Sequence, residues 1–167
     1  MEIAAYRAEM FDGVETLWDE AFQGVPPRGG TAGSIADKMG EHPELFLVGL
    51  DGGAVIATVM AGYDGHRGWL YSVAVRASHR RRGIGAMLVR EAVARLTALG
   101  CRKVNLQVLP ENAAVAAFYE SLGFAVEERI SMGMALPATI ATPSEATIEP
   151  LPEAAAGNHR KEHLAGR

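Results

Sequence analysis

Apolar and polar residues recur along this chain with two different periods, which together predict a mixed α/β (α+β) fold. Alternating or continuous apolar stretches, typical of strands, occupy residues 2–7, 45–50, 54–62, 69–75 and 104–109. Apolar residues at helical spacing predict helices over residues 12–22, 34–41, 84–100 and 113–122. Residues 124–136 alternate loosely, which predicts a final strand or a strand pair broken near Arg129.

Short polar residues and glycines mark where these elements should begin and end. Asp12 is a candidate N-cap of the first helix, and Ser34 or Thr31 a candidate N-cap of the second. Asp51-Gly52-Gly53 between two apolar stretches predicts a hairpin. Gly100 is expected just after the last turn of the third helix.

The composition changes after Leu136. Residues 137–167 hold Pro, Ala, Thr and Glu without a helical or strand period and without an aromatic residue. Such a segment cannot bury enough apolar surface to offset its ordering entropy. We therefore expect one domain over residues 1–136 and a disordered or loosely docked tail over 137–167. His159 and His163 have the i, i+4 spacing of a metal pair, but no other ligand lies near them in sequence, and we predict no metal site.

Composition and charge narrow the class of protein. The 167 residues are 49% apolar and 22% charged with a net charge of −4, which is typical of a soluble globular protein without a general attraction to nucleic acid or acidic lipid. The single cysteine, Cys101, excludes an intrachain disulfide and suits a reducing compartment. The first residues do not resemble a signal peptide, and no apolar run reaches the roughly 20 residues of a membrane span. We expect a cytoplasmic protein.

The stretch 69–87 combines a strand, a basic turn and the start of a helix. Aromatic and β-branched residues fill 69–75, three arginines follow at 80–82, and Gly83 and Gly85 open the helical spacing. The first turn of a helix has unpaired backbone N–H groups and the positive end of the helix dipole. Glycines let an anion approach that backbone, and arginines add charge. The stretch therefore predicts a pyrophosphate site.

Other interpretations of this stretch are less consistent with the residues. A dinucleotide fingerprint needs a third glycine where Leu88 stands, and a P-loop needs a Gly-Lys-Ser/Thr sequence that does not follow. A solvated arginine run that caps a helix and a nucleic-acid patch remain as alternatives. The basic character is confined to one turn of an acidic chain, which favours a small anionic ligand over a polyanion.

Two motifs in this chain resemble those of the GNAT N-acetyltransferases, which bind acetyl-coenzyme A (acetyl-CoA). Arg80-Arg81-Arg82-Gly83-Ile84-Gly85 is similar to the family's Arg/Gln-x-x-Gly-x-Gly/Ala signature. Asn112 follows at the family's spacing, with Ala117-Phe118-Tyr119-Glu120 and Leu122-Gly123-Phe124 after it. The resemblance covers residues 1–136. The run Gly62–Gly68, the arginine turn and Gly100-Cys101 look closest to the bacterial YpeA-type acetyltransferases.

The resemblance implies a GNAT fold: a central mixed, mostly antiparallel sheet whose fourth and fifth strands splay apart, flanked by about four helices. In that fold the edge of the fourth strand pairs with the pantetheine arm of acetyl-CoA as an added strand; here that edge is Val73, Ala74 and Val75. The Asn112 side chain would bind the pantetheine region. Backbone N–H groups of the turn and helix start would bind the pyrophosphate, over Arg81, Arg82, Gly83, Ile84, Gly85 and Ala86.

Direct acetyl transfer needs a neutral amine, a donor for the thioester oxygen and a proton for the leaving thiolate. Tyr119 resembles the family's general acid, and the alternative is a half-buried core tyrosine. Some relatives carry a glutamate base where this chain has Gln107, and an amide cannot take a proton. An ordered water chain, Glu111, Asp64 or His66 are the alternatives for the base.

The acceptor and the partners are predicted only as classes. Residues 63–68 form either a plain turn or a substrate-facing loop, since they hold a phenol, a carboxylate, an imidazole and a guanidinium. We expect an acetyl-CoA-dependent enzyme that acetylates a protein N-terminus, a lysine or a small-molecule amine, with no nucleic-acid or membrane partner; a homodimer is common among similar proteins. One alternative is a non-catalytic acyl-CoA-binding sensor. Another is a regulatory module for a different nucleotide, and this second alternative requires that strands four and five do not splay apart.

Overall fold

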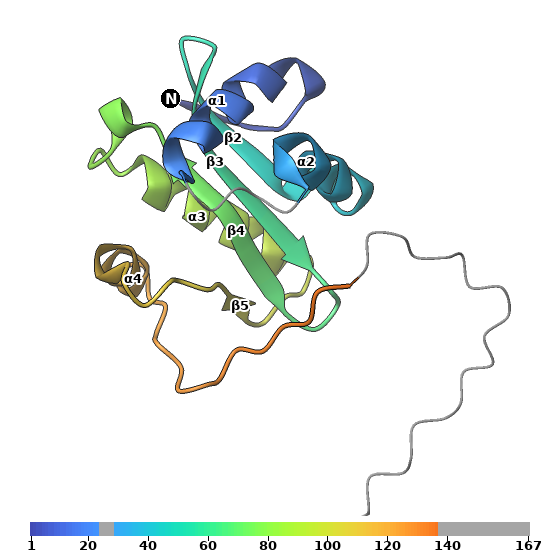
Figure 1. The fold of residues 1–167 in the computed structure, drawn as a ribbon, viewed down its shortest axis with the longest axis vertical. Coiled ribbons are helices and arrows are strands. Elements are labelled where there is room, and N and C mark those ends of the chain that lie inside the picture. Colours follow the sequence, from blue (N-terminus) through green and yellow to red (C-terminus); the bar gives the residue numbers. More distant parts are fainter. Residues whose placement is uncertain (24–28, 137–167) are drawn as a thin grey trace, which may run out of the picture. The chain divides into compact units, whose positions relative to one another are not determined.

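The computed structural model describes residues 1–23 and 29–136 (Figure 1). The chain divides into two units, Met1–Glu127 and Glu128–Arg167. The first unit holds every helix and strand in the described part of the chain. The predicted tail, with His159 and His163, lies outside the described residues. No helix among the described residues is long and apolar enough to cross a membrane.

The centre of the first unit is one five-stranded sheet with the strand order β1-β2-β3-β4-β5. The pairs β1–β2, β2–β3 and β3–β4 are antiparallel, and the pair β4–β5 is parallel, which confirms the predicted mixed, mostly antiparallel sheet. The tight β2–β3 turn contains Gly52 and Gly53, both with positive φ, which confirms the predicted hairpin. The strands are β1 (Glu2–Ala5), β2 (Phe46–Asp51), β3 (Ala54–Tyr63), β4 (Gly68–Val75) and β5 (Val104–Asn105).

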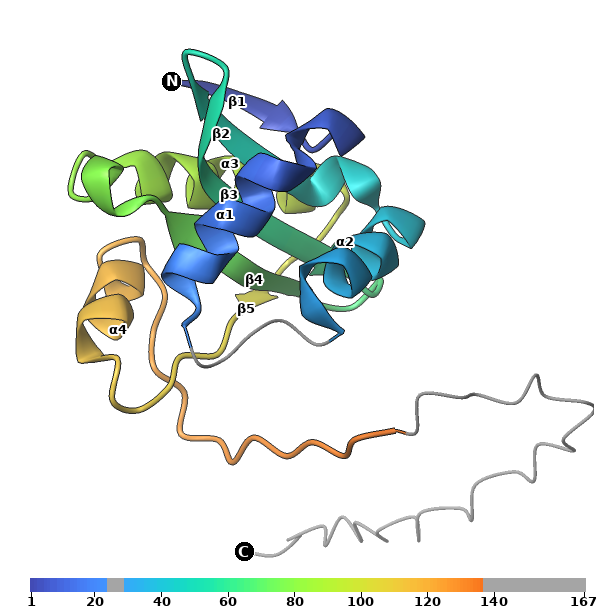
Figure 2. The ribbon, with the colours of Figure 1, turned by 45° about the horizontal axis from the view of Figure 1, so that its top comes forward.

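Helices cover both faces of this sheet (Figure 2). The four are α1 (Phe11–Ala21), α2 (Gly30–Gly40), α3 (Ile84–Ala98) and α4 (Ala113–Glu120). The first two lie on one face and α3 lies on the other (Figures 1 and 2). One buried cluster forms around Trp18 and Phe46 on the α1 side, and a second forms around Leu88 and Leu96 on the α3 side. The sheet is therefore buried on both faces, which explains the nearly continuous apolar sequence of β3.

The predicted helix caps are wrong. Helix α1 begins after Met10 without a side-chain cap, because the 3-10 turn Ala8–Met10 already leads the backbone into it. Asp12 lies in the first helical turn instead, where its charge favours the helix dipole. Helix α2 begins at Gly30, after Gly29 with φ 72°, and therefore includes both candidate cap residues, Thr31 and Ser34.

Two strand predictions are also wrong. β5 covers only Val104–Asn105 rather than residues 104–109, and residues 124–136 contain no strand. An alternating sequence becomes a strand only where a partner strand offers hydrogen bonds. The large apolar side chains of the last segment stay between 67% and 91% exposed: Val126, Ile130, Met132, Met134 and Leu136.

The splay of strands β4 and β5 is visible in their register. They pair only at Gly68 with Val104 and at Trp69 with Asn105. Strand β4 continues to Val75 with β3 on its other side, but β5 ends after its second residue. In the described part of the chain, β4 therefore has a strand partner on one side only from Leu70 onward. After β5 ends, Leu106 and Val108 still bury part of their side chains against the α3-side core.

Helix α1 docks on the sheet through a glycine. An added Cβ at Gly13 would lie 2.7 Å from Cγ2 and 2.9 Å from Cβ of Val55 in β3. Atoms at those distances must move apart, and Val55 is 6% exposed and cannot move freely. The absence of a side chain at Gly13 therefore sets how closely α1 approaches β3.

Gly13→Ala should destabilise the protein although alanine is the better helix residue. We expect overpacking of about 1–3 kcal/mol to outweigh a gain of about 1 kcal/mol in helix propensity. Chemical unfolding measures the difference. Gly40→Ala in α2 is the matched control, because an added Cβ there meets nothing within 4 Å; it should be neutral or stabilising. Equal stability of the two variants would contradict this account of the α1 contact.

Candidate active site

The basic turn between β4 and α3 leads into the helix start whose backbone N–H groups are the predicted cradle for a pyrophosphate. Arg81 and Gly83 both have positive φ, 61° and 77°, and the helix begins at Ile84. The Met87 N–H donates to the Gly83 carbonyl at 3.0 Å. The backbone N–H groups that come before Met87 in the first turn of α3 have no acceptor within the helix, because an α-helix offers none to its first N–H groups. This helix start is compatible with the predicted anion site, which stays a prediction.

The arginines of the turn have different positions. Arg80 Nε donates to the Val75 carbonyl at 3.0 Å, which ties the turn to the end of β4. Arg81 and Arg82 are exposed and carry their charge at the helix start. The sequence motif therefore divides into one arginine that shapes the turn and two that face solvent. The role of these two in binding phosphate stays a prediction.

Gly85 connects the two sequence motifs. An added Cβ would lie 3.4 Å from Phe118 Cζ in α4 and 3.4 Å from Val75 Cγ2 in β4. The start of α3, the end of β4 and α4 therefore meet at this glycine. The sequence pattern predicts that both motif glycines allow the approach of a phosphate. At Gly85 a Cβ would already reach contact distance from both neighbours, whereas Gly83 has a left-handed backbone with open space beside it.

Helix α4 places Asn112 and Tyr119 at its two ends. The Asn112 carbonyl accepts the N–H groups of Val115 and Ala116, while its side chain makes no capping bond. Its exposed amide is thus available to a ligand. Tyr119 is 8% exposed and packs edge-on against Phe118 and Phe124, with ring centroids 5.0 and 5.6 Å away.

The burial of Tyr119 affects both interpretations of this residue. Its ring belongs to the α3-side core, as a structural tyrosine would. Burial raises the pKa of its phenol to about 12, which keeps the proton in place at neutral and moderately alkaline pH. The phenol is therefore a permanent hydrogen-bond donor, but a weaker acid than a free tyrosine. Its catalytic role stays a prediction.

The structure argues against one of the candidate bases, Asp64. Asp64 accepts the backbone N–H groups of His66 at 2.7 Å and Arg67 at 2.6 Å, and these bonds lower the pKa of its carboxyl. A carboxylate stabilised in this way is a poor proton acceptor, which argues against Asp64 as the base. Glu111 and Gln107 are exposed on the segment that precedes α4.

Cysteine and metal chemistry receive no geometric support from the described part of the chain. Cys101 is buried, and its thiol donates to the Lys103 carbonyl at 3.1 Å, which fits a small apolar residue between α3 and β5. No group of three or more His, Cys, Asp or Glu side chains among residues 1–23 and 29–136 could hold a metal ion.

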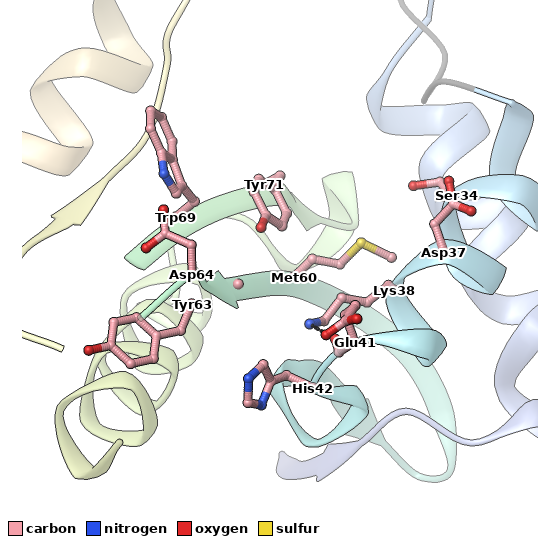
Figure 3. Close-up of a pocket in the computed structure, with 11 residues that line it drawn as sticks. Ser34, Asp37, Lys38, Glu41, His42, Met60, Tyr63, Asp64, Trp69 and Tyr71 are labelled. Carbon is pink, nitrogen blue, oxygen red and sulfur yellow. Dashed lines mark hydrogen bonds between the residues drawn. The ribbon is translucent and has the colours of Figure 1, made fainter. Parts of the chain in front are cut away.

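A cavity of about 380 Å³ lies between α2 and the ends of β3 and β4 (Figure 3). Residues of α2 face those of the two strands across it. The predicted loop contributes Tyr63 and Asp64, but the α2 residues were missed at the sequence level. Their i, i+3, i+4, i+7 spacing was the available signal, since it puts them on one face of a helix. The cavity is lined by Ser34, Asp37, Lys38, Glu41, His42, Met60, Gly62, Tyr63, Asp64, Trp69 and Tyr71.

Tyr71 forms one wall of the cavity. An added Cβ at Gly62 would lie 2.0 Å from its hydroxyl oxygen, so the ring can lie against β3 only because residue 62 is glycine. Burial, and then the charge of Asp64, raise the pKa of the phenol. Tyr71 is thus a neutral aromatic wall that ends in a hydroxyl.

The charges around the cavity are mainly negative. Asp37, Glu41 and Asp64 bring three carboxylates, and Lys38 brings one ammonium. Lys38 is 8% exposed and donates to the Glu41 carbonyl at 2.6 Å, at the C-terminal end of α2. Burial lowers the pKa of this amine, and the charges of Glu44 and Glu41 oppose the shift. The lysine ammonium is therefore bonded at the helix end, and three of the four Asp, Glu and Lys side chains that line the cavity are carboxylates.

Known proteins share both sequence and fold with this chain. Residues 11–124 match the acetyltransferase (GNAT) family. The chain is 37% identical over 130 residues to acetyltransferase SG1711 of Sodalis glossinidius, covering 78% of this chain and 91% of that protein. It is also 37% identical over 136 residues to acetyltransferase ECA0875 of Pectobacterium atrosepticum, covering 81% and 96%.

Solved structures show the same fold at low identity. The crystal structure of aminoglycoside 6'-N-acetyltransferase AAC(6')-IG from Acinetobacter haemolyticus superposes with a TM-score of 0.68 at 19% identity, over 82% of this chain and 99% of that one. AAC(6')-Iy in complex with a bisubstrate analogue of CoA and acetylneamine gives 0.67 at 19% identity, over 81% and 98%. The regulatory-module interpretation required strands that do not splay, and the observed register of β4 and β5 removes its basis.

If the turn binds pyrophosphate, substitutions at two glycines with similar positive φ should differ in their effect on acetyl-CoA binding. Gly83→Ala and Gly53→Ala both place a side chain at positive φ, 77° and 82°, in open space. Each should lose about 1–2 kcal/mol of stability. Only Gly83→Ala should also weaken acetyl-CoA binding, by about tenfold or more, because its methyl group would stand before the helix start. Calorimetric titration checks this, and equal affinities in the two variants would refute the cradle.

Proposed function

Because the chain belongs to the GNAT acetyltransferase family, we propose that it moves the acetyl group of acetyl-CoA directly to a primary amine held in the cavity between α2, β3 and β4. One observation carries this assignment. The cavity residues Met60 and Tyr71 are paired across β3 and β4, and the segment predicted to bind the pantetheine arm begins two residues later, at Val73. An amine in the cavity would thus lie beside the thioester.

The bound acetyl-CoA would supply the activated acetyl group, and residues of this chain would orient it. Val73, Ala74 and Val75 would pair with the pantetheine arm along the side of β4 that β5 leaves open. The backbone of residues 81–86 would hold the pyrophosphate. Tyr119 would donate a hydrogen bond to the leaving sulfur, and the Asn112 amide would bind the arm. A homodimer and a cytoplasmic location stay predictions.

The acidic cavity favours a particular class of amine. Carboxylates attract an ammonium group, but they also raise its pKa and so oppose the deprotonation that attack requires. An acceptor with two amines resolves this conflict, because one ammonium can bind the carboxylates while the other amine reacts uncharged. We therefore propose a small diamine or polyamine-like acceptor, or an amine that carries a second cationic group.

The acceptor class is tested with 1,4-diaminobutane and n-butylamine, which have the same carbon chain and differ in one charge. The diamine should have the higher kcat/KM. Asp37→Asn and Glu41→Gln should each lower that preference by about threefold to tenfold, and less in high salt. Glu15→Gln on the exposed side of α1 removes the same charge elsewhere and is the control. A preference for butylamine in the parent protein would overturn the diamine proposal without touching the acetyltransferase assignment.

Tyr119→Phe tests the proposed donor, because it keeps the ring packing and removes the hydroxyl. Single-turnover acetylation should slow by about 10²–10⁴ if full general acid catalysis is lost, with acetyl-CoA affinity nearly unchanged. Because the pKa of Tyr119 is about 12, the parent rate should rise as the amine deprotonates and should not fall between pH 7 and pH 10. A stable Tyr119→Phe protein with an unchanged single-turnover rate would exclude this role.

A further inference from the structure

Strand β4 contains a bulge at the start of the segment predicted to bind acetyl-CoA. Met60 pairs with Tyr71 and Thr58 pairs with Ala74, so one residue of β3 is opposite two residues of β4, Ser72 and Val73. Ser72 has φ 50°, a left-handed conformation that costs a non-glycine residue about 1–2 kcal/mol. Something in the surrounding structure must offset this cost.

The bulge reverses which residues of β4 face which side of the sheet. Leu70 packs in the α3-side core, and without a bulge the next even-numbered residues would do the same. Instead Val73 and Val75 pack against that core, while Ala74 packs in the α1-side core. The bulge therefore sets the orientation of all three residues predicted to pair with the pantetheine arm.

A buried chain of two hydrogen bonds fixes the bulge from the α1 side. Trp18 Nε1 in α1 donates to Thr58 Oγ1 at 2.9 Å, and Thr58 Oγ1 donates to the Ser72 carbonyl at 2.9 Å. Thr58 is completely buried, and Trp18 is 1% exposed. An indole N–H can only donate, so the hydroxyl must accept from it and give its single proton to Ser72. The direction of both bonds is fixed.

The bond to the Ser72 carbonyl also orients the next backbone N–H. The carbonyl of Ser72 and the N–H of Val73 belong to the same peptide group, and no described peptide bond is cis. In a trans peptide the two groups point in opposite directions. When Thr58 holds the carbonyl, the Val73 N–H must point away from Thr58.

We propose that Thr58 is a positioning residue that aims the Val73 N–H at the thioester oxygen of acetyl-CoA. This inference rests on the proposed function, because it takes acetyl-CoA to bind along β4. Negative charge develops on the thioester oxygen during transfer, and a donor that is already aimed stabilises it without reorganisation. Trp18 donates to the Thr58 hydroxyl oxygen and thereby orients the hydroxyl proton toward Ser72. Its effect on the reaction is therefore indirect.

The test compares acetyl-CoA with S-ethyl-CoA, a thioether of similar size that lacks the carbonyl oxygen. The parent protein should bind acetyl-CoA more tightly. Thr58→Val keeps the side-chain shape and removes the hydroxyl, and should reduce the affinity ratio of the two ligands by about twofold to tenfold, the net worth of one hydrogen bond. Thr58→Ser keeps the hydroxyl and should restore the ratio to within twofold of the parent.

Two further variants separate positioning from stability. Trp18→Phe removes the indole donor but leaves the bond from Thr58 to Ser72, so the melting temperature should fall while the ratio stays near the parent value. The double variant Thr58→Val/Ser72→Gly relieves the left-handed strain, and therefore keeps the test available if Thr58→Val alone does not fold. The double variant should be folded and still show the reduced ratio.

The outcomes distinguish this inference from the proposed function. A folded Thr58→Val or double variant with the parent ratio would overturn the positioning role, and so would a parent protein that binds the two ligands equally. Failure of the parent protein to bind either CoA derivative would overturn the proposed function and this inference together. A ratio that falls equally in Trp18→Phe and Thr58→Val would show that the network acts only through general core stability.

Discussion

Strand β4 has neighbouring strands on both sides only at its first two residues, and the site depends on where that double pairing stops. Before this point, Gly68 and Trp69 are ordinary central positions of a sheet. Beyond it, the strand keeps its bonds to β3 and has a side without a strand partner in the described residues. Backbone N–H and C=O groups on such a side must find another partner, and an amide-bearing ligand can supply one. A binding site thus arises from backbone geometry before any side chain is considered.

Close packing by glycine determines where the helices lie around this strand. Gly13 brings α1 onto β3, and Gly85 brings the start of α3 against Val75 and Phe118. Gly62 lets the Tyr71 ring lie against β3 and so shapes the cavity wall. An added Cβ would collide with buried Val55 at Gly13 and with the hydroxyl of the half-exposed Tyr71 at Gly62, and it would reach ordinary contact distance from its neighbours at Gly85. The approach of α1 to β3 is therefore set by sterics, because the buried Val55 has little room to move.

Much of the fold follows from local sequence signals. The hairpin at Gly52-Gly53 and the long helix α3 are as predicted, because each depends on periodicity and turn residues that lie close together in sequence. The mixed sheet is also as predicted, but that expectation came from the family resemblance. The GNAT family is likewise confirmed by the match over residues 11–124. The YpeA-type subgroup stays an interpretation, since the comparisons do not separate it from other acetyltransferases.

The features missed at the sequence level are set by distant residues. Nothing near Ser72 marks it as a bulge, because the groups that hold it are Thr58 and Trp18, and these two are themselves 40 positions apart. Strand β5 ends where β4 diverges from it. The alternating sequence of residues 104–109 does not indicate that point. The acidic face of α2 was visible as helical spacing, but only the approach of β3 and β4 makes it a cavity wall.

Positive and negative side chains lie near opposite ends of β4. This arrangement would suit the proposed reaction between an anionic and a cationic substrate. The arginine turn follows the C-terminal end of β4, while the carboxylates of Asp37, Glu41 and Asp64 surround the cavity near its beginning. CoA carries its negative charge on phosphates at one end and its thioester at the other. Binding the phosphates at the turn and running the arm back along β4 would bring the uncharged thioester toward the cavity. The CoA phosphates would then contact the arginines, and the second ammonium of the acceptor would contact the carboxylates. The thioester and the reacting amine, both uncharged, would meet between these two charged regions.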